Sequence, residues 1–247
     1  MTAVRLALLL GRQYVRSSFL VALFIIVPLV FLNLAYVTTK DVDLPVLVTE
    51  GGSRVALAVG QPDLHASYMI PFVAAFLAGI SGLFVTLEAR RSDERLRIAG
   101  LPSGTVAATR LLMIATVAVL VAFLSVAIGL IQFRPNAVLG FTLGTVLVSL
   151  SYGWIGAVVS VLVGRLGGAY LMLLLPMMDI GIFQNPMFIS GDHAWWMKLL
   201  PGFGGMRFVI DAAFSGRADD WNALLIGLAW AVGLSVATTI VLQRRPR

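Results

Sequence analysis

The chain has 247 residues, of which 59% are hydrophobic and only 12% are charged, and it carries a net charge of +6. Soluble domains average about 45–50% apolar and about 25% charged residues, so this composition excludes an ordinary soluble enzyme, a nucleic-acid-binding domain and a disordered chain. The absence of cysteine excludes disulfides, iron–sulfur clusters and thiol catalysis. We therefore expect an all-α polytopic membrane protein, with residues 1–247 forming one transmembrane domain.

Residues 2–17 precede the first long apolar stretch. Arg5, Arg12 and Arg16 are spaced to share one helical face, and apolar side chains lie largely opposite them. This pattern predicts an amphipathic helix on the membrane surface, with the three arginines contacting anionic lipid headgroups. The alternative is a basic flank that only sets the orientation of the first span.

Six stretches are long and apolar enough for transmembrane helices, which need about 20 such residues. None shows the period-2 alternation of barrel strands. The first stretch is too long for the apolar region of a signal peptide and no cleavage site follows it, so we expect it to be retained. The six predicted spans are residues 18–37, 68–87, 106–133, 137–163, 169–188 and 221–242.

The distribution of basic residues predicts the orientation. With the N-terminus inside, twelve arginines lie on the inner side, against six lysines and arginines outside. An even number of spans then places both termini in the cytoplasm. The basic inner face suits anionic lipid, and nucleic acid is not an expected partner. The scarcity of lysine is typical of a GC-rich bacterial genome, so we expect a multi-pass protein of the bacterial inner membrane.

Two outer segments, residues 38–67 and 189–220, are too short to form independent domains. The second contains two apolar pieces, residues 195–201 and 206–214, that are too short to span the membrane. They predict short re-entrant or interfacial helices that cap the outer face before the last span.

A charged helix is expected at residues 88–100, between the second and third spans. Asp93 and Arg97 have the spacing of an ion pair along a helix. A connection between spans needs only a few polar residues, whereas this one combines charges with the apolar residues Leu96 and Ile98. It suits docking onto a cytoplasmic partner. The alternative is a solvated turn that only orients the protein.

Asp179 is the one acidic residue well inside a predicted span, roughly 15 Å deep at 1.5 Å per residue. Pro176 interrupts the helix one turn earlier, and Gln184 and Asn185 continue the polar series. These residues are candidates for lining a translocation route or binding a cationic group. The alternative is an acid whose hydrogen bonds come from a neighbouring helix.

The chain lacks the motifs of several chemistries. It has no phosphate-binding loop ending in Gly-Lys-Ser/Thr, no His-Glu-x-x-His zinc motif and no Gly-x-Ser-x-Gly elbow. We therefore expect no catalytic, cofactor or metal site in this chain. An intramembrane enzyme or a secondary transporter that uses Asp179 is the alternative, and a membrane anchor or sensor without transport activity is a further one.

A glutamate closes the second predicted span, and the charged helix ends in Leu-x-x-x-x-Leu-Pro at Leu96, Leu101 and Pro102. This resembles the membrane subunits of ATP-binding-cassette exporters of type 2, in which the stretch commonly reads Glu-x-x-x-Gly-Thr-Leu-Glu-x-Leu-x-x-x-Pro. Here residues 92–96, Ser-Asp-Glu-Arg-Leu, replace the Gly-Thr-Leu core. The order of the predicted elements also matches, so the resemblance covers nearly the whole chain in pattern.

The resemblance implies a homodimer or heterodimer of membrane subunits that binds two copies of an ATPase subunit, which holds the ATP and magnesium. The helix after the second span would be the coupling helix, and Arg165 in the turn at residues 164–168 would make a smaller contact. A hydrophobic small molecule, a drug or a lipid-like compound is the implied substrate. The residues implied to face or support the main ATPase contact are Glu88, Arg90, Arg91, Asp93, Glu94, Arg95 and Leu96.

Overall fold

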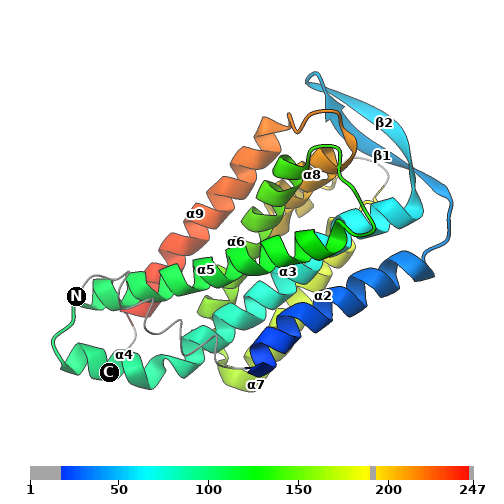
Figure 1. Ribbon diagram of the computed structural model, residues 1–247. Helices are drawn as coiled ribbons and strands as arrows, with labels where there is room; N and C mark the ends of the chain where they lie inside the picture. The colour runs from blue at the N-terminus through cyan, green and yellow to red at the C-terminus, as the bar shows by residue number, and fades with distance from the viewer. Residues whose placement is uncertain (1–17, 190–192, 245–247) are drawn as a thin grey trace.

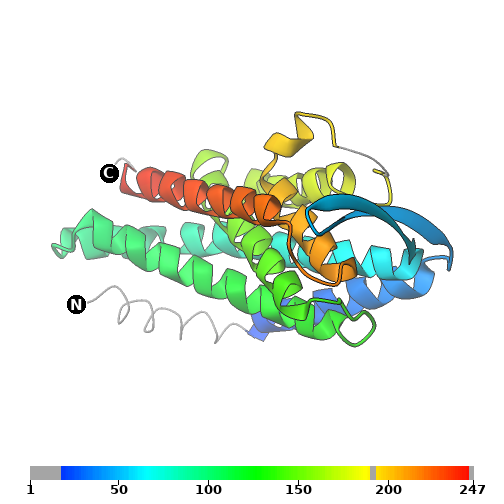
Figure 2. The ribbon, with the colours of Figure 1, turned by 90° about the horizontal axis from the view of Figure 1, so that it is seen from above.

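The computed structural model describes residues 18–189 and 193–244. The predicted helix at residues 2–17, with Arg5, Arg12 and Arg16, lies outside this part of the chain. Long helices run lengthwise through the molecule, and a β-hairpin and the short helix α8 lie together at one end (Figure 1). The short helix α4 lies at the opposite end (Figure 2). We call these the hairpin end and the α4 end.

The long helices follow the predicted spans. Five of them are long and apolar enough to cross a membrane, and α2 has a shorter apolar part, Phe24–Thr38, in the residues searched. The chain is therefore a predominantly helical, multi-pass membrane protein. The long helices are α2 (Ser18–Thr38), α3 (Gln61–Glu88), α5 (Ser103–Gly129), α6 (Val138–Leu162), α7 (Gly164–Met178), which continues into the π-helical turn η1 (Asp179–Phe183), and α9 (Trp221–Gln243).

A β-hairpin occupies most of the segment between α2 and α3, so an all-α fold does not describe this segment. Strands β1 (Asp43–Glu50) and β2 (Ser53–Gly60) pair antiparallel, with Glu50 opposite Ser53. Gly51 and Gly52 form the turn with φ of 58° and 81°, which side-chain-bearing residues rarely adopt. The Gly-Gly pair between two runs of valine and leucine is the sequence signal for this hairpin.

The hairpin packs onto the bundle through one face. Val46 and Val48 of β1 are buried in a cluster with Leu64 and Tyr68 of α3 and with Ile210 of α8. On the same face of β2, Leu57 and Val59 are half-buried against this cluster, whereas Val55 is exposed. The hairpin therefore covers the ends of α3 and α8.

Helices α3 and α6 cross so closely that their backbones touch. A methyl group at Gly82 would lie 2.1 Å from the carbonyl oxygen of Gly153, and one at Gly156 would lie 2.0 Å from that of Gly79. Small residues allow such approach in lipid. A side chain at Gly82 or Gly156 would force the helices apart.

Helix α8 (Pro201–Phe214) begins at the last residue of the first predicted apolar piece and contains the whole of the second one together with the glycines between them. These glycines lie within α8 and let it approach its neighbours closely. A methyl group at Gly204 would lie 2.4 Å from the amide nitrogen of Gly227 in α9. A short 3-10 helix, η2 (Met197–Leu199), precedes α8.

Candidate functional site

Helix α4 (Arg90–Ile98) lies within the predicted charged segment and follows α3 with only Ala89 between them. Gly100 has a φ of 87°, so the chain turns sharply there, and α5 starts at Ser103. This turn places the beginning of α5 beside α4. The α4 end of the bundle is therefore a compact junction of α3, α4 and α5.

One face of α4 is open to solvent. Most of the side chains predicted to contact a partner are exposed, Leu96 is half-buried, and Ile98 is 81% exposed. Charges of both signs around an exposed apolar side chain form a surface that can bind another protein. The exposed predicted residues are Glu88, Arg90, Arg91, Glu94 and Arg95.

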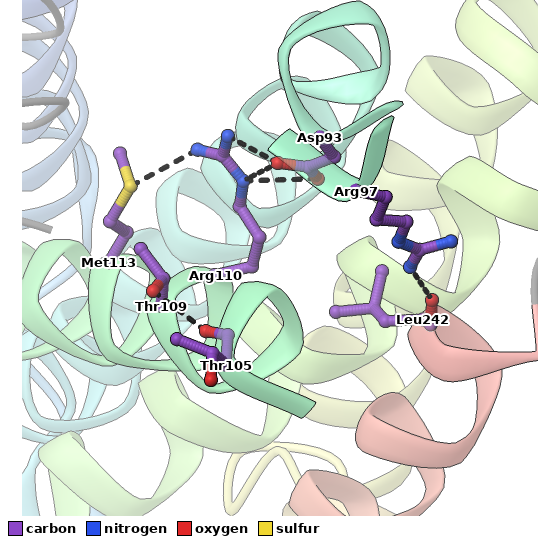
Figure 3. Close-up of polar contacts among 7 residues, drawn as sticks. All are labelled: Asp93, Arg97, Thr105, Thr109, Arg110, Met113 and Leu242. Atoms are coloured by element: carbon purple, nitrogen blue, oxygen red, sulfur yellow. Dashed lines mark hydrogen bonds and ion pairs between the residues drawn. The ribbon is translucent and has the colours of Figure 1, made fainter. Parts of the chain in front are cut away.

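The opposite face of α4 carries a buried ion pair. Arg110 of α5 donates from Nε to both carboxylate oxygens of Asp93, at 2.9 and 3.2 Å, and from Nη2 to Oδ1 at 2.6 Å (Figure 3). Its Nη1 lies 3.2 Å from the sulfur of Met113. The side chains of Arg110 and Asp93 are only 4% and 12% exposed. Removing one partner of such a pair costs about 3–5 kcal/mol.

This ion pair differs from the predicted one. The sequence spacing predicts that Asp93 pairs with Arg97 along α4, but Asp93 instead bonds Arg110 on the next helix. Arg97 donates from Nη2 to the carbonyl oxygen of Leu242 at 2.7 Å, in the last turn of α9 (Figure 3). A cation there also interacts favourably with the helix dipole. Helix α4 is thus bonded to both α5 and α9.

Arg165 lies at the same end of the bundle, at the start of α7. Its guanidinium sits over the ring of Phe84 in α3, 5.4 Å from the ring centre, in a cation–π arrangement. Phe84 lies one turn before Glu88, the last residue of α3. The structure therefore places Arg165 near α4, and its role in a second partner contact stays a prediction.

Asp179 is buried between three helical elements. Its Oδ2 accepts hydrogen bonds from the hydroxyl of Tyr152 in α6 and the amide of Gly202 in α8, both at 2.7 Å, and its Oδ1 accepts one from Nε2 of Gln184 at 3.2 Å. These are neutral donors. Since Leu200 before α8 offers no side-chain cap, the carboxylate of Asp179 takes that role at the amino end of α8.

The structure thus supplies hydrogen-bond partners for the polar residues of this span. Gln184 and Asn185 are 4% and 1% exposed, and Asn185 bonds the backbone of Gly181 and Met187. The donors to Asp179 are a tyrosine, a glutamine and a backbone amide, and two of the three come from α6 and α8. Because Asp179, Gln184 and Asn185 are buried and hydrogen-bonded, the structure favours a structural role for them. Their role in a translocation route stays a prediction.

A second carboxylate network, which the sequence did not reveal, lies at the hairpin end. Asp211 of α8 accepts the amide of Thr49 at 2.8 Å and the amides of Asp219 and Asp220 at 3.2 Å. Burial raises the pKa of Asp211, and the hydrogen bond from the Thr49 amide opposes this shift. Thr49 and Asp211 are far apart in the sequence, so no local pattern connects them.

Asp220 completes this network. It accepts the amide of Ala223 at 3.1 Å as the N-cap of α9, and a charged hydrogen bond from Nε of Arg207 at 2.5 Å. Thr49 also donates its hydroxyl to Asp220, at 3.2 Å. An aspartate directly before an apolar helix is a cap signal that the sequence offers. The hairpin, α8 and α9 are therefore bonded together.

No group of three or more His, Asp or Glu side chains within residues 18–189 and 193–244 is arranged to bind a metal ion. No protein-family model matches the chain, and a search of the curated proteins also finds no match.

Proposed function

We propose that this chain is the membrane subunit of an ATP-driven exporter of the ATP-binding-cassette type 2 class. The observation that carries the proposal is the two-sided character of α4. Its charged face is exposed, whereas Asp93 on the other face bonds α5. A docked partner can therefore move α4, and α4 transmits the force to the long helices.

The exposed face has the features of a docking surface. Arg91, Glu94 and Arg95 offer charges of both signs that fix the register of a partner, and Ile98 offers an apolar anchor. The resemblance of residues 88–102 to the coupling segment of the type 2 exporters supports the same assignment.

The remaining parts of the proposal follow from that assignment. Two ATPase subunits hold ATP and magnesium, and a second membrane subunit completes a homodimer or heterodimer. ATP binding closes the ATPases, moves the docked α4 helices and reorients the spans. The substrate is a hydrophobic small molecule, a drug or a lipid-like compound. Both termini lie in the cytoplasm, and Arg165 makes the smaller ATPase contact.

Site-specific photo-cross-linking in native membranes tests the proposal. The full chain carries an affinity tag and a photo-reactive amino acid at Arg91 in α4, or at the exposed Ser53 directly after the hairpin turn as the matched control. We expect a phosphate-loop ATPase to be cross-linked from position 91 and not from position 53. Mass spectrometry identifies the product.

Two outcomes contradict the proposal. One is that positions 91, 94 and 95 all fail to capture an ATPase. The other is that the tagged chain, purified from native membranes in mild detergent, has no associated ATP hydrolysis.

A further inference from the structure

Helix α4 is attached to the bundle by two joints of different construction. The α5 joint consists of Asp93 with Arg110 and Met113, and the α9 joint consists of Arg97 with the carbonyl oxygen of Leu242 (Figure 3). The first connects α4 to the helix that follows it. The second connects α4 to the last helix of the chain.

The α5 joint is built to stay closed. The guanidinium of Arg110 makes three contacts of 2.6 to 3.2 Å with the carboxylate of Asp93. Both charges are almost fully buried, so opening the joint would leave each of them unpaired away from water. The short turn at Gly100 adds a covalent connection. Helices α4 and α5 therefore behave as one body.

The α9 joint is weaker than the α5 joint and opens at a lower cost in free energy. It is a single hydrogen bond of 2.7 Å from a half-buried arginine to a backbone carbonyl. The Nε of Arg97 is buried without a hydrogen-bond partner among the described residues. The guanidinium therefore leaves one of its buried donors unsatisfied in this joint. The carbonyl belongs to the last turn of α9, where carbonyls have no partner within the helix and accept alternative donors. Opening this joint separates no opposite charges.

We infer that α4 and α5 move together when α4 is displaced, and that the bond between Arg97 and Leu242 opens to let this body move relative to α9. Arg97 is thus a positioning residue that keeps α9 against α4 in the resting arrangement. This inference rests on the proposed function only for the cause of the displacement, which is the docked ATPase. The unequal joints are a property of the chain itself.

Spin-label distances test the two joints in the isolated chain. Because the chain contains no cysteine, cysteines introduced at the exposed positions Ser92, Leu112 and Ile240 report on α4, α5 and α9 without background. We expect Arg97→Met to shift or broaden the distance between positions 92 and 240 and to leave that between 92 and 112 unchanged. Methionine keeps the apolar stem and removes the donors.

Arg110→Met is the opposite variant, and we expect it to broaden the 92–112 distance. If that variant does not fold, the exchange Asp93→Arg with Arg110→Asp restores the pair and is expected to restore the narrow 92–112 distance. An unchanged 92–240 distance in Arg97→Met, or equal broadening of both distances, overturns the inference.

A second arm uses the complex with the ATPase. A non-hydrolysable ATP analogue is expected to change the 92–240 distance in the wild-type background and not the 92–112 distance, and a change in 92–112 overturns the inference. If no ATPase binds, the proposed function fails while the first arm still decides the joints. If the ATPase binds and the first arm fails, the inference fails and the proposed function stands.

Discussion

The α4 end and the hairpin end both bury carboxylates, but they compensate them differently. At the α4 end, Asp93 faces the guanidinium of Arg110 in a tight ion pair. At the hairpin end, Asp211 accepts backbone amides, and Arg207 reaches only the neighbouring Asp220. An ion pair depends on one opposing side chain, whereas an amide-bound carboxylate depends on where several backbone segments lie. The α4 end is therefore sensitive to single charge changes, and the hairpin end is sensitive to loop geometry.

The largest expected effect is at the α4 end. Arg110→Met leaves Asp93 buried without its cation, and we expect the free energy of unfolding to fall by about 3–5 kcal/mol. Thermal unfolding in detergent measures this loss. The exchanged pair, Asp93→Arg with Arg110→Asp, serves as the control and should recover part of the stability. Equal stability of wild type and Arg110→Met would contradict a buried pair.

Asp179 in the middle of the bundle is expected to give a smaller effect. Asp179→Ala leaves the Tyr152 hydroxyl and the Gly202 amide without an acceptor, at a cost of about 1–3 kcal/mol. Asp179→Asn should cost less, because the asparagine side chain keeps one oxygen that can accept from the Tyr152 hydroxyl and the Gly202 amide.

The same variants decide between the two roles of Asp179. We expect the Asp179→Asn protein to fold and to retain export, which would exclude an essential negative charge at this position. A folded variant that has lost all export would instead support a place in the translocation route. Unfolding temperature and export are therefore measured on the same preparations.

The N-cap of α9 gives the next smaller effect at the hairpin end. Asp220→Ala removes the cap, for which we expect a loss of about 0.5–2 kcal/mol, and removes the partner of Arg207. Asp220→Asn keeps the cap and removes only the charge, so it serves as the matched variant. The rate of proteolysis at the hairpin turn measures how firmly the hairpin is held on the bundle. The prediction fails if Asp220→Ala and Asp220→Asn give the same proteolysis rate and the same stability.

The smallest effect on stability is expected from the exposed face of α4. Reversing the charges at Arg91, Glu94 and Arg95 should change the free energy of unfolding by less than about 0.5 kcal/mol, because these side chains are solvated. The same triple variant should uncouple ATP hydrolysis from export. Transport and coupling like those of the wild type would remove this face from the proposed partner contact.

Much of the fold was predictable, because a run of about 20 apolar residues is recognisable without knowledge of tertiary contacts. Each long helix lies at a predicted span. The hairpin was not predicted, because each of its strands has only a few alternating valines and leucines and polar residues flank them on both sides. The partner of Asp93 was misassigned because local spacing favours Arg97, whereas the turn at Gly100 brings Arg110 closer. The network around Asp211 joins segments that only tertiary packing brings together.

The close crossing of α3 and α6 has a mechanical consequence. The glycine contacts at Gly79 and Gly82 act as a fulcrum, because the two backbones meet there with no side chains between them. At 1.5 Å per residue, α3 extends roughly 30 Å from this point to its hairpin end but only about 10 Å to Glu88 beside α4. If α3 tilts as a rod, a small displacement at α4 becomes a movement roughly two to three times larger beneath the hairpin.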